Sequence, residues 1–299
     1  MQTWIFFVLL AQIMWAFCSM IDKNVISKGY LTNPLVYIVL NGVSNLSLFL
    51  LLPFFKFSPL SFIDFSAALA SSVLAFVGVM LYYEAVKYEE ISRITMLYPF
   101  TPLFVIILSF FFLSESLSIY NLFGFALLIA AGLIAAYHKS KKIFRLNRAF
   151  YLMVGSTFSI SIAYITAKHV FMVTDFWSGV LWLRLTGFSA FLVLLIPSVR
   201  NNFVKSFRKM RPATKKLLGF KVTIDAIAFT ISDYAILLGP VSLVAALSNA
   251  SAPLFTFALA LVSTLYLPSF VREDTHRENI LMKLIALLFI IIGIIFINF

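Results

Sequence analysis

The sequence predicts an all-α polytopic membrane protein with ten transmembrane helices arranged as two inverted repeats of five helices. Hydrophobic excess, ten long apolar runs and a likeness between the two halves lead to this prediction. Of the 299 residues, 62% are hydrophobic and 12% are charged, and the mean hydropathy is +1.01. Soluble domains have about 45–50% apolar and about 25% charged residues. Lipid is therefore the expected solvent for most of this chain.

The apolar runs define the expected helices in chain order. A hydrocarbon core about 30 Å thick is crossed by about 20 residues of α-helix. The expected spans are 2–20, 33–52, 66–87, 91–113, 119–138, 149–170, 176–197, 217–238, 241–266 and 280–298. Helices are expected because an unpaired backbone group in hydrocarbon costs several kcal/mol, and the alternating polar pattern of barrel strands is missing.

Basic residues predict the orientation. If the connections are numbered in order, 20 of the 23 Lys and Arg fall on the side of the odd-numbered connections. The longest of these connections, 198–216, holds seven of them, whereas the opposite side has only Lys56 and Lys168. Lys and Arg accumulate in cytoplasmic loops. The odd connections are therefore expected in the cytoplasm and both termini outside, in a membrane that we expect to be the plasma membrane.

The two halves of the chain repeat each other. Tyr83 and residues 101–104 reappear 151 positions later as Tyr234 and residues 252–255. The residues Leu127, Ile129, Gly132 and Ile134 match Leu288, Ile290, Gly293 and Ile295 at an offset of 161. With five spans in each copy, the second copy enters the membrane from the opposite side. Inverted repeats of this kind commonly enclose a site near the bilayer midplane.

Four motifs of the first half are specific: residues 81–85 (LYYEA), 98–104 (YPFTPLF), 114–118 (SESLS) and 124–132 (GFALLIAAG). Together they resemble the EamA-type domain of the drug/metabolite transporter superfamily, and the likeness occurs twice, in 1–143 and in 144–299. The resemblance implies a ten-helix carrier with a central cavity. The second copy departs from the motif, because Tyr266 and the segment Arg272, Glu273, Asp274 stand where the first copy has Glu115. Members of the family usually have cytoplasmic termini, whereas the charge count here predicts the reverse.

Ionisable residues inside a membrane span cost about 2.5–3.5 kcal/mol each on insertion scales, and three of those inside the predicted spans stand out. Asp225 and Asp233 are on one broad face of the eighth span, and Arg184 is within the seventh. Counted from the outer face, Arg184 and Asp233 lie at depths of roughly 12 and 8 Å and Asp225 at roughly 20 Å. Either carboxylate is a possible partner for Arg184. The three residues predict either a substrate or proton site or a structural ion pair.

Polar and aromatic side chains inside the spans are further candidates to line a cavity. They are Trp15, Asn41, Asn45, Tyr83, Tyr98, Thr101, Tyr164, Tyr234, Ser248, Asn249 and Ser251. Hydrogen bonds between helices are the alternative role of such residues. Pro99, Pro102 and Pro253 occupy corresponding places in the two copies, where interruptions of helices point to a binding site.

No enzyme signature is found: the three histidines are scattered, the cysteine Cys18 is alone, and no metal-ligand or phosphate-loop pattern occurs. We expect no cofactor, no metal and no nucleic-acid partner, and a small-molecule substrate in a lipid bilayer. The preferred function is a secondary transporter that moves a small metabolite or drug-like compound by alternating access around a central cavity. The alternatives are an intramembrane enzyme or lipid-handling protein that uses the buried aspartates, and a channel or scaffold. The oligomeric state is not indicated by the sequence.

Overall fold

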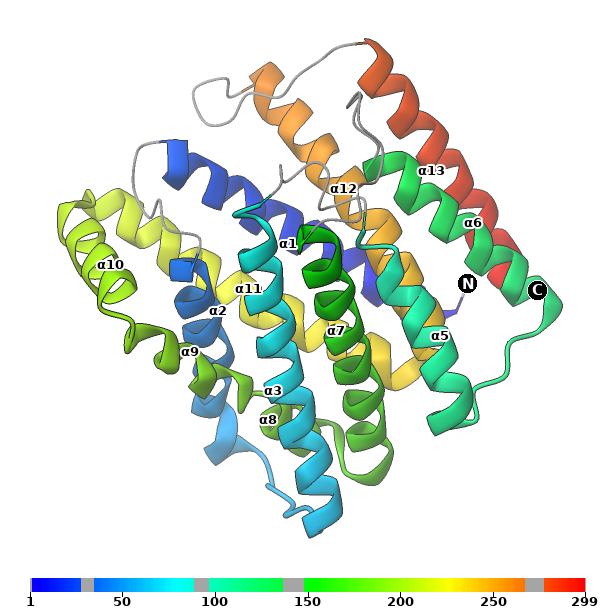
Figure 1. Cartoon of the computed structure of the whole chain (residues 1–299), viewed down its shortest axis with the longest axis horizontal. Coiled ribbons are helices and arrows are strands. Elements are labelled where there is room, and N and C mark those ends of the chain that lie inside the picture. Colours follow the sequence, from blue (N-terminus) through cyan, green and yellow to red (C-terminus); the bar gives the residue numbers. More distant parts are fainter. Residues whose placement is uncertain (1, 28–34, 89–96, 137–147, 267–276, 299) are drawn as a thin grey trace.

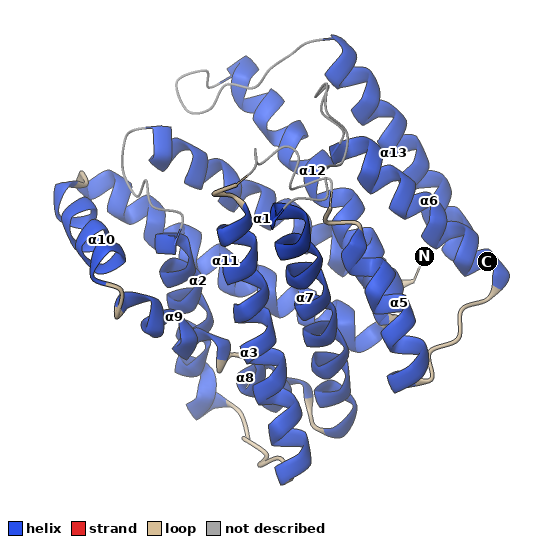
Figure 2. Ribbon diagram, viewed as in Figure 1, coloured by secondary structure: helices blue, strands red, loops and turns tan. Residues whose placement is uncertain are grey.

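The structure, a computed structural model, describes residues 2–27, 35–88, 97–136, 148–266 and 277–298. Every regular element in these ranges is a helix, which confirms the all-α prediction (Figure 2). The helices are α1 (Thr3–Ser27), α2 (Leu35–Ser47), η1 (Leu48–Phe54), α3 (Phe62–Ala85), α5 (Phe100–Leu113), α6 (Ile119–Ala136), α7 (Arg148–Val173), α8 (Phe176–Leu183), α9 (Thr186–Leu194), α10 (Pro197–Lys209), α11 (Pro212–Leu238), α12 (Val241–Tyr266) and α13 (Arg277–Ile297).

Four of these helices are long and apolar enough to cross a membrane: α1, α3, α7 and α12. Four further apolar segments are shorter. They lie in α2 together with η1, in α5, in α6 and in α13. Each expected span corresponds to a helix or to a pair of consecutive helices among the described residues. The charged segment Arg272, Glu273, Asp274 lies outside the described residues.

The structure corrects the prediction of one uninterrupted helix over 176–197. This span is divided into α8 and α9, and the break falls at Arg184 and Leu185. The adjoining connection 198–216, expected only as a basic loop, contains the helix α10. Pro197 lies in the first turn of α10, where its fixed φ favours the helix and its missing N–H costs nothing.

Two of the prolines predicted to interrupt helices lie at the start of α5. Pro99 is the N-cap of α5 and Pro102 lies in its first turn. Amides of the first turn have no acceptor within the helix, so a proline there removes no hydrogen bond. Pro253 does lie inside a helix, α12, as predicted.

Several of the main helix contacts are kept when the five expected spans of the first half are exchanged with those of the second. The exchange converts the packing of α3 against α7 into that of α11 against α1, and α5 against α7 into α12 against α1. The contacts of α2 with α9 and of α6 with α13 are converted into themselves. Figure 1 shows α6 beside α13 at one end of the molecule and α2 beside α9 at the other.

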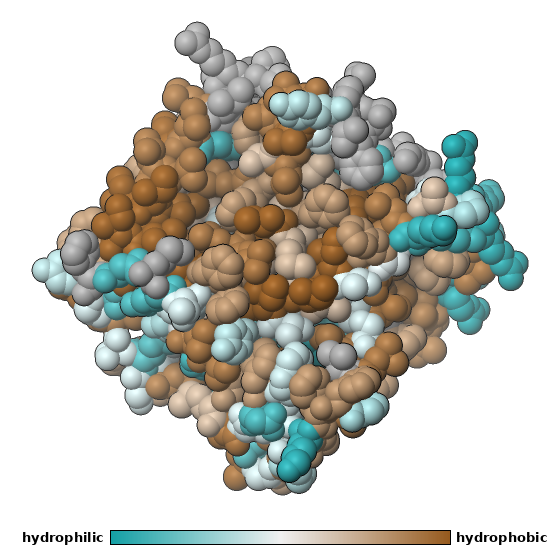
Figure 3. All heavy atoms as spheres, turned by 180° about the vertical axis from the view of Figure 1, so that it is seen from behind, coloured by the Kyte–Doolittle hydropathy of each residue, from teal (hydrophilic) through white to brown (hydrophobic). Residues whose placement is uncertain are grey.

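The surface is apolar over a wide area. Figure 3 shows hydrophobic residues across most of the face that it presents, with hydrophilic residues gathered mainly toward its edges. On α5, Phe110, Phe111 and Phe112 are 61%, 73% and 73% exposed. Contiguous apolar surface of this extent is unusual on water-soluble monomers. Contact with lipid is its simplest explanation.

Candidate functional site

A cavity of about 260 Å³ lies between the packed pair α3 and α7 and the helix α11. Residues of α1, α2 and the end of α8 complete its wall. Its polar lining consists of Asn41, Asn45, Ser71, Tyr164, Arg184, Ser232 and Asp233. Its aromatic lining consists of Trp15, Phe76, Tyr164 and Phe229. Apolar walls with a few convergent polar groups are typical of small-molecule sites.

The break between α8 and α9 places Arg184 at this cavity. Asp175 caps the start of α8 by accepting a hydrogen bond from the backbone N–H of Ser178 at 3.0 Å. At the other end, the N–H of Arg184 is within hydrogen-bond distance of two carbonyl oxygens of the last turn, at 3.1 and 3.2 Å. The hydroxyl of Ser72 on α3 donates to the carbonyl of Leu183 at 3.3 Å. The helix end is thus held against α3, and Arg184 lies where α8 stops.

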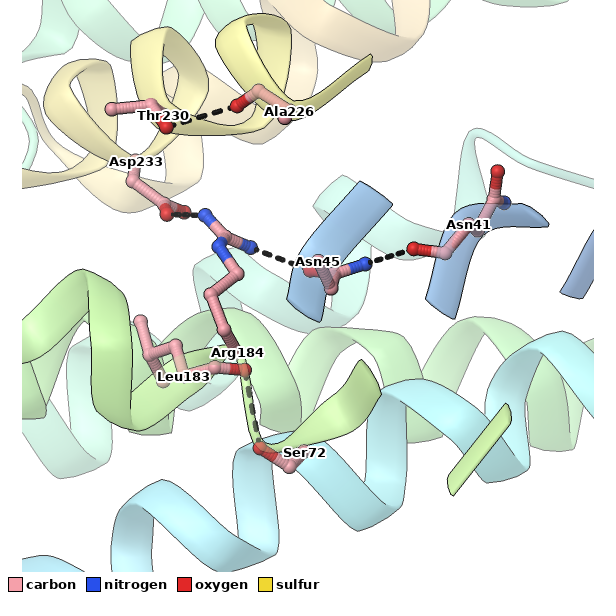
Figure 4. A network of polar contacts seen from close by, with 8 residues as sticks. All are labelled: Asn41, Asn45, Ser72, Leu183, Arg184, Ala226, Thr230 and Asp233. Carbon is pink, nitrogen blue, oxygen red and sulfur yellow. Dashed lines mark hydrogen bonds and ion pairs between the residues drawn. The ribbon is translucent and has the colours of Figure 1, made fainter. Parts of the chain in front are cut away.

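Arg184 joins three helices through its guanidinium (Figure 4). It forms an ion pair with Asp233 of α11, and Nη1 donates to Oδ1 of Asn45 on α2 at 3.1 Å. Its Cζ atom lies 5.3 Å from the ring centroid of Phe229, a cation–π arrangement. Arg184 is 5% exposed and Asp233 is 8% exposed, so the pair is shielded from solvent. Desolvation makes such a pair expensive unless both charges are well partnered.

Several polar groups of the lining still have capacity for a ligand. Nε of Arg184 is buried and makes no hydrogen bond among the described residues. Within the same part of the chain, the side chains of Asn41, Tyr164 and Ser232 form no hydrogen bond to a protein group. The ring of Phe229 also meets Trp15 edge to face, with centroids 5.2 Å apart. The cavity therefore combines unused donors with two rings that can cover an apolar ligand surface.

The structure brings six of the residues predicted for the site or its cavity together, namely Arg184, Asp233, Trp15, Asn41, Asn45 and Tyr164. The other candidates lie elsewhere. Tyr234 packs against Phe7 and Phe176. Tyr83 and Tyr98 both contact Tyr82.

Asn249 donates to the carbonyl of Ala245 one turn earlier in α12 at 2.9 Å. Pro253 also lies on α12, which contributes no residue to the cavity wall. At the level of helices the lining follows the expected equivalence of the two halves: α1 and α7, α2 and the end of α8, and α3 and α11 all contribute described residues, whereas neither α5 nor α12 does.

Asp225 belongs to a second polar cluster that the sequence did not predict. Nζ of Lys221 lies 3.2 Å from Oδ2 of Asp225 and 3.3 Å from Oδ2 of Asp22 on α1. Asp225 and Asp233 are eight residues apart on α11, about 12 Å along the helix axis. The readable signal for this cluster was the spacing of Lys221 and Asp225, which puts their side chains on one helix face. Phe229, also missed, lies midway between the two aspartates.

The comparison with known families bears on the first half of the chain. Residues 2–137 match the model of the EamA-like transporter family. The resemblance read from the sequence motifs is confirmed for the first half of the chain. Together with the apolar helices, this EamA match identifies the chain as an integral membrane protein, and the matched family is one of transporters.

Solved structures give the fold alone. One crystal structure, described only as that of a protein, covers 98% of this chain and 96% of its own at a TM-score of 0.73 and 12% identity. This likeness of fold extends over both halves of the chain. No curated protein matches the sequence.

Proposed function

We propose that this chain is a secondary transporter in which a small metabolite or drug-like compound binds in the cavity at Arg184. The observation that carries the proposal is the buried Arg184–Asp233 pair at the break of a helix, beside a cavity lined by unused donors. Helix interruptions at transporter sites supply backbone and side-chain groups to substrates. A purely structural pair would not need a cavity next to it.

The lining favours a small amphipathic compound with an anionic or hydrogen-bond-accepting group. Nε of Arg184, the hydroxyls of Tyr164 and Ser232 and the amide of Asn41 can donate to such a group. Trp15 and Phe229 offer rings for the apolar part. A hydrogen-bond-accepting group of the substrate would compete with Asp233 for the guanidinium of Arg184. This competition would weaken the ion pair that holds α11 to the break between α8 and α9.

Alternating access by two repeats follows from the same proposal. The division into 1–143 and 144–299 is supported by several of the main helix contacts, which are kept when the halves are exchanged. Two units related in this way can rock against each other and open a shared cavity to either side in turn. The placement in the plasma membrane, with the basic connections in the cytoplasm, is part of the proposal and rests on the charge asymmetry.

Flux through reconstituted vesicles tests the function. A thermal-shift screen of a metabolite library against the purified protein selects candidate compounds, and radiolabelled forms of those that bind are followed into vesicles. A carrier gives saturable uptake that accelerates when unlabelled compound is present on the far side. Arg184→Gln should abolish uptake, whereas Arg200→Gln on α10, an exposed arginine remote from the cavity, should leave it unchanged. Flux linear in concentration indicates a channel, and a chemically altered product indicates an enzyme; either result refutes the proposal.

A further inference from the structure

The cluster of Asp22, Lys221 and Asp225 lies between α1 and α11, apart from the cavity at Arg184. Lys221 is 2% exposed and Asp225 is 4% exposed. One ammonium group therefore lies between a buried carboxylate, Asp225, and a carboxylate whose side chain is 25% exposed, Asp22. If both carboxylates are ionised, the cluster has one negative charge in excess.

The carboxylate oxygens are not fully satisfied by their neighbours. Oδ1 of Asp22 is buried and accepts no hydrogen bond among the described residues. Oδ2 of Asp225 is within ion-pair distance of Lys221 but is likewise without a hydrogen-bond donor in suitable geometry. A buried anionic oxygen without a donor is costly, because water has been removed and nothing replaces it. The cluster thus has an uncompensated negative charge and carboxylate oxygens that lack a hydrogen-bond donor.

Three further groups near the cluster, in the part of the chain that the structure describes, do not supply this charge. The sulfur of Cys18 on α1 lies 3.8 Å from the carbonyl oxygen of Lys221, and the phenol of Tyr83 on α3 is near enough to Asp22 to interact electrostatically. On the α2 side, Ser44 donates to the carbonyl of Val222 at 3.0 Å. None of these three groups is a cation at neutral pH.

A proton suits this cluster better than a metal ion. Lys221 already occupies the position between the two carboxylates, so a metal ion there would be repelled at close range by the ammonium group. A proton adds no volume, binds directly to a carboxylate oxygen and brings the cluster to neutrality. Ionisable residues inside membrane helices commonly serve as proton relays.

We propose that the Asp22–Lys221–Asp225 cluster is a proton-binding site that couples transport to a proton gradient; this inference rests on the transporter function proposed above. One proton from water binds to a carboxylate oxygen of Asp22 or Asp225 and is later released to water, with no other bond made or broken. The link to the substrate is α11, which carries Asp225 in the cluster and Asp233 at the cavity. Movement of this one helix changes the surroundings of both.

Infrared difference spectroscopy tests the site without a substrate, with the proton itself as the probe. The full chain in lipid vesicles is titrated from alkaline to acidic pH, and the carbonyl band of a protonated buried carboxyl group is followed. The wild type should gain this band, whereas Asp22→Asn and Asp225→Asn should each lose it. Asp64→Asn, at the start of α3, is the matched control and should keep it. A band that persists in both cluster variants, or that never forms in the wild type, overturns the proposal.

Thermal stability gives a second, independent readout. Either single Asp→Asn change leaves one carboxylate for Lys221, so each variant should melt at least as high as the wild type at alkaline pH. An ordinary structural ion pair predicts the opposite, and a variant that melts lower or fails to fold at alkaline pH refutes the proton site.

Transport then separates the two proposals. Saturable counterflow that is retained in Asp225→Asn, with loss only of accumulation driven by a pH gradient, supports both. Counterflow in the wild type without any effect of a pH gradient refutes only the coupling, and absence of counterflow refutes the transporter function itself.

Discussion

Glu115 and Lys168 bind the two sides of a single interhelical turn, the one between α11 and α12. The carboxylate of Glu115 accepts hydrogen bonds from the backbone N–H of Val241 at 2.9 Å and of Ser242 at 3.3 Å. Nζ of Lys168 donates to the carbonyl oxygens of Ile236, Leu237 and Gly239 at 2.7, 2.8 and 3.0 Å. An anion thus meets the start of α12 and a cation meets the end of α11, each complementing the helix dipole. Both helix ends are fixed by residues near the C-terminal ends of other helices, Glu115 just after α5 and Lys168 in α7.

Removing the acidic side of this arrangement should destabilise the protein without affecting the cavity. Glu115→Ala leaves amides at the start of α12 without their acceptor, and the loss of such a cap costs about 1–2 kcal/mol. Unfolding of the purified protein in detergent measures this difference. Glu84→Ala is the control: its partner Lys87 is 61% exposed, and exposed pairs contribute at most about 1 kcal/mol. Equal losses in the two variants would contradict the capping role.

The Arg184–Asp233 pair should behave as a coupled unit in stability and also serve binding. Arg184→Gln leaves Asp233 as an uncompensated buried charge, which costs about 3–5 kcal/mol. Combining Arg184→Gln with Asp233→Asn removes both charges, so most of that stability should return. The double variant should nevertheless show no thermal shift with compounds that stabilise the wild type. A double variant that still binds them would reduce the pair to a structural role.

The close approach of α6 to α13 is expected to be sensitive to a single methyl group. A Cβ atom at Gly124 on α6 would lie 2.8 Å from the carbonyl oxygen of Gly293 on α13, and 2.7 Å from a side-chain carbon of Ile297. Backbone atoms cannot move aside without parting the helices, so Gly124→Ala should cost about 1–3 kcal/mol. Gly219→Ala on α11 is the matched control, because nothing lies within 4 Å of its new methyl group. The stability of that variant should be unchanged or should rise by up to about 1 kcal/mol, because alanine has a higher helix propensity than glycine. Thermal unfolding of both proteins decides between these expectations.

The sequence predicted the helical class and the region of the site because both depend on composition along the chain. Long apolar runs locate the helices, and a charge within such a run needs a partner wherever the helices pack. Depth estimates left Arg184 equally free to meet Asp225 or Asp233. The choice of Asp233 depends on how α11 is rotated against α8, which no local pattern encodes.

Other parts of the site were beyond local reasoning for related reasons. The segment 176–196 contains no proline, so the sequence carried no helix-breaking proline that would have predicted the break at Arg184. Tyr83 and Tyr234 correspond in the two repeats, yet neither lines the cavity, since sequence equivalence does not fix which face of a helix meets the shared interior. Lys221 was counted among the cytoplasmic basic residues because it stands near the end of an apolar run. Its spacing from Asp225 was the neglected signal.

The predicted orientation can be tested with single cysteines at two exposed asparagines. In a Cys18→Ala background, Asn201→Cys places a thiol on the basic helix α10, and Asn298→Cys places one at the end of α13. The charge asymmetry puts α10 in the cytoplasm and the C-terminal end outside. In intact cells an impermeant maleimide should therefore label the Asn298→Cys variant and leave the Asn201→Cys variant unmodified.

Permeabilised cells supply the control for this experiment. Both thiols should react once the membrane is opened, because Asn201 and Asn298 are exposed in the structure. The only native cysteine, Cys18, is buried, so its replacement removes background without removing a surface group. Rapid labelling of the Asn201→Cys variant in intact cells, with protection of the Asn298→Cys variant, would reverse the orientation. The basic helix would then face outward, and the charge asymmetry would need a cause other than membrane insertion.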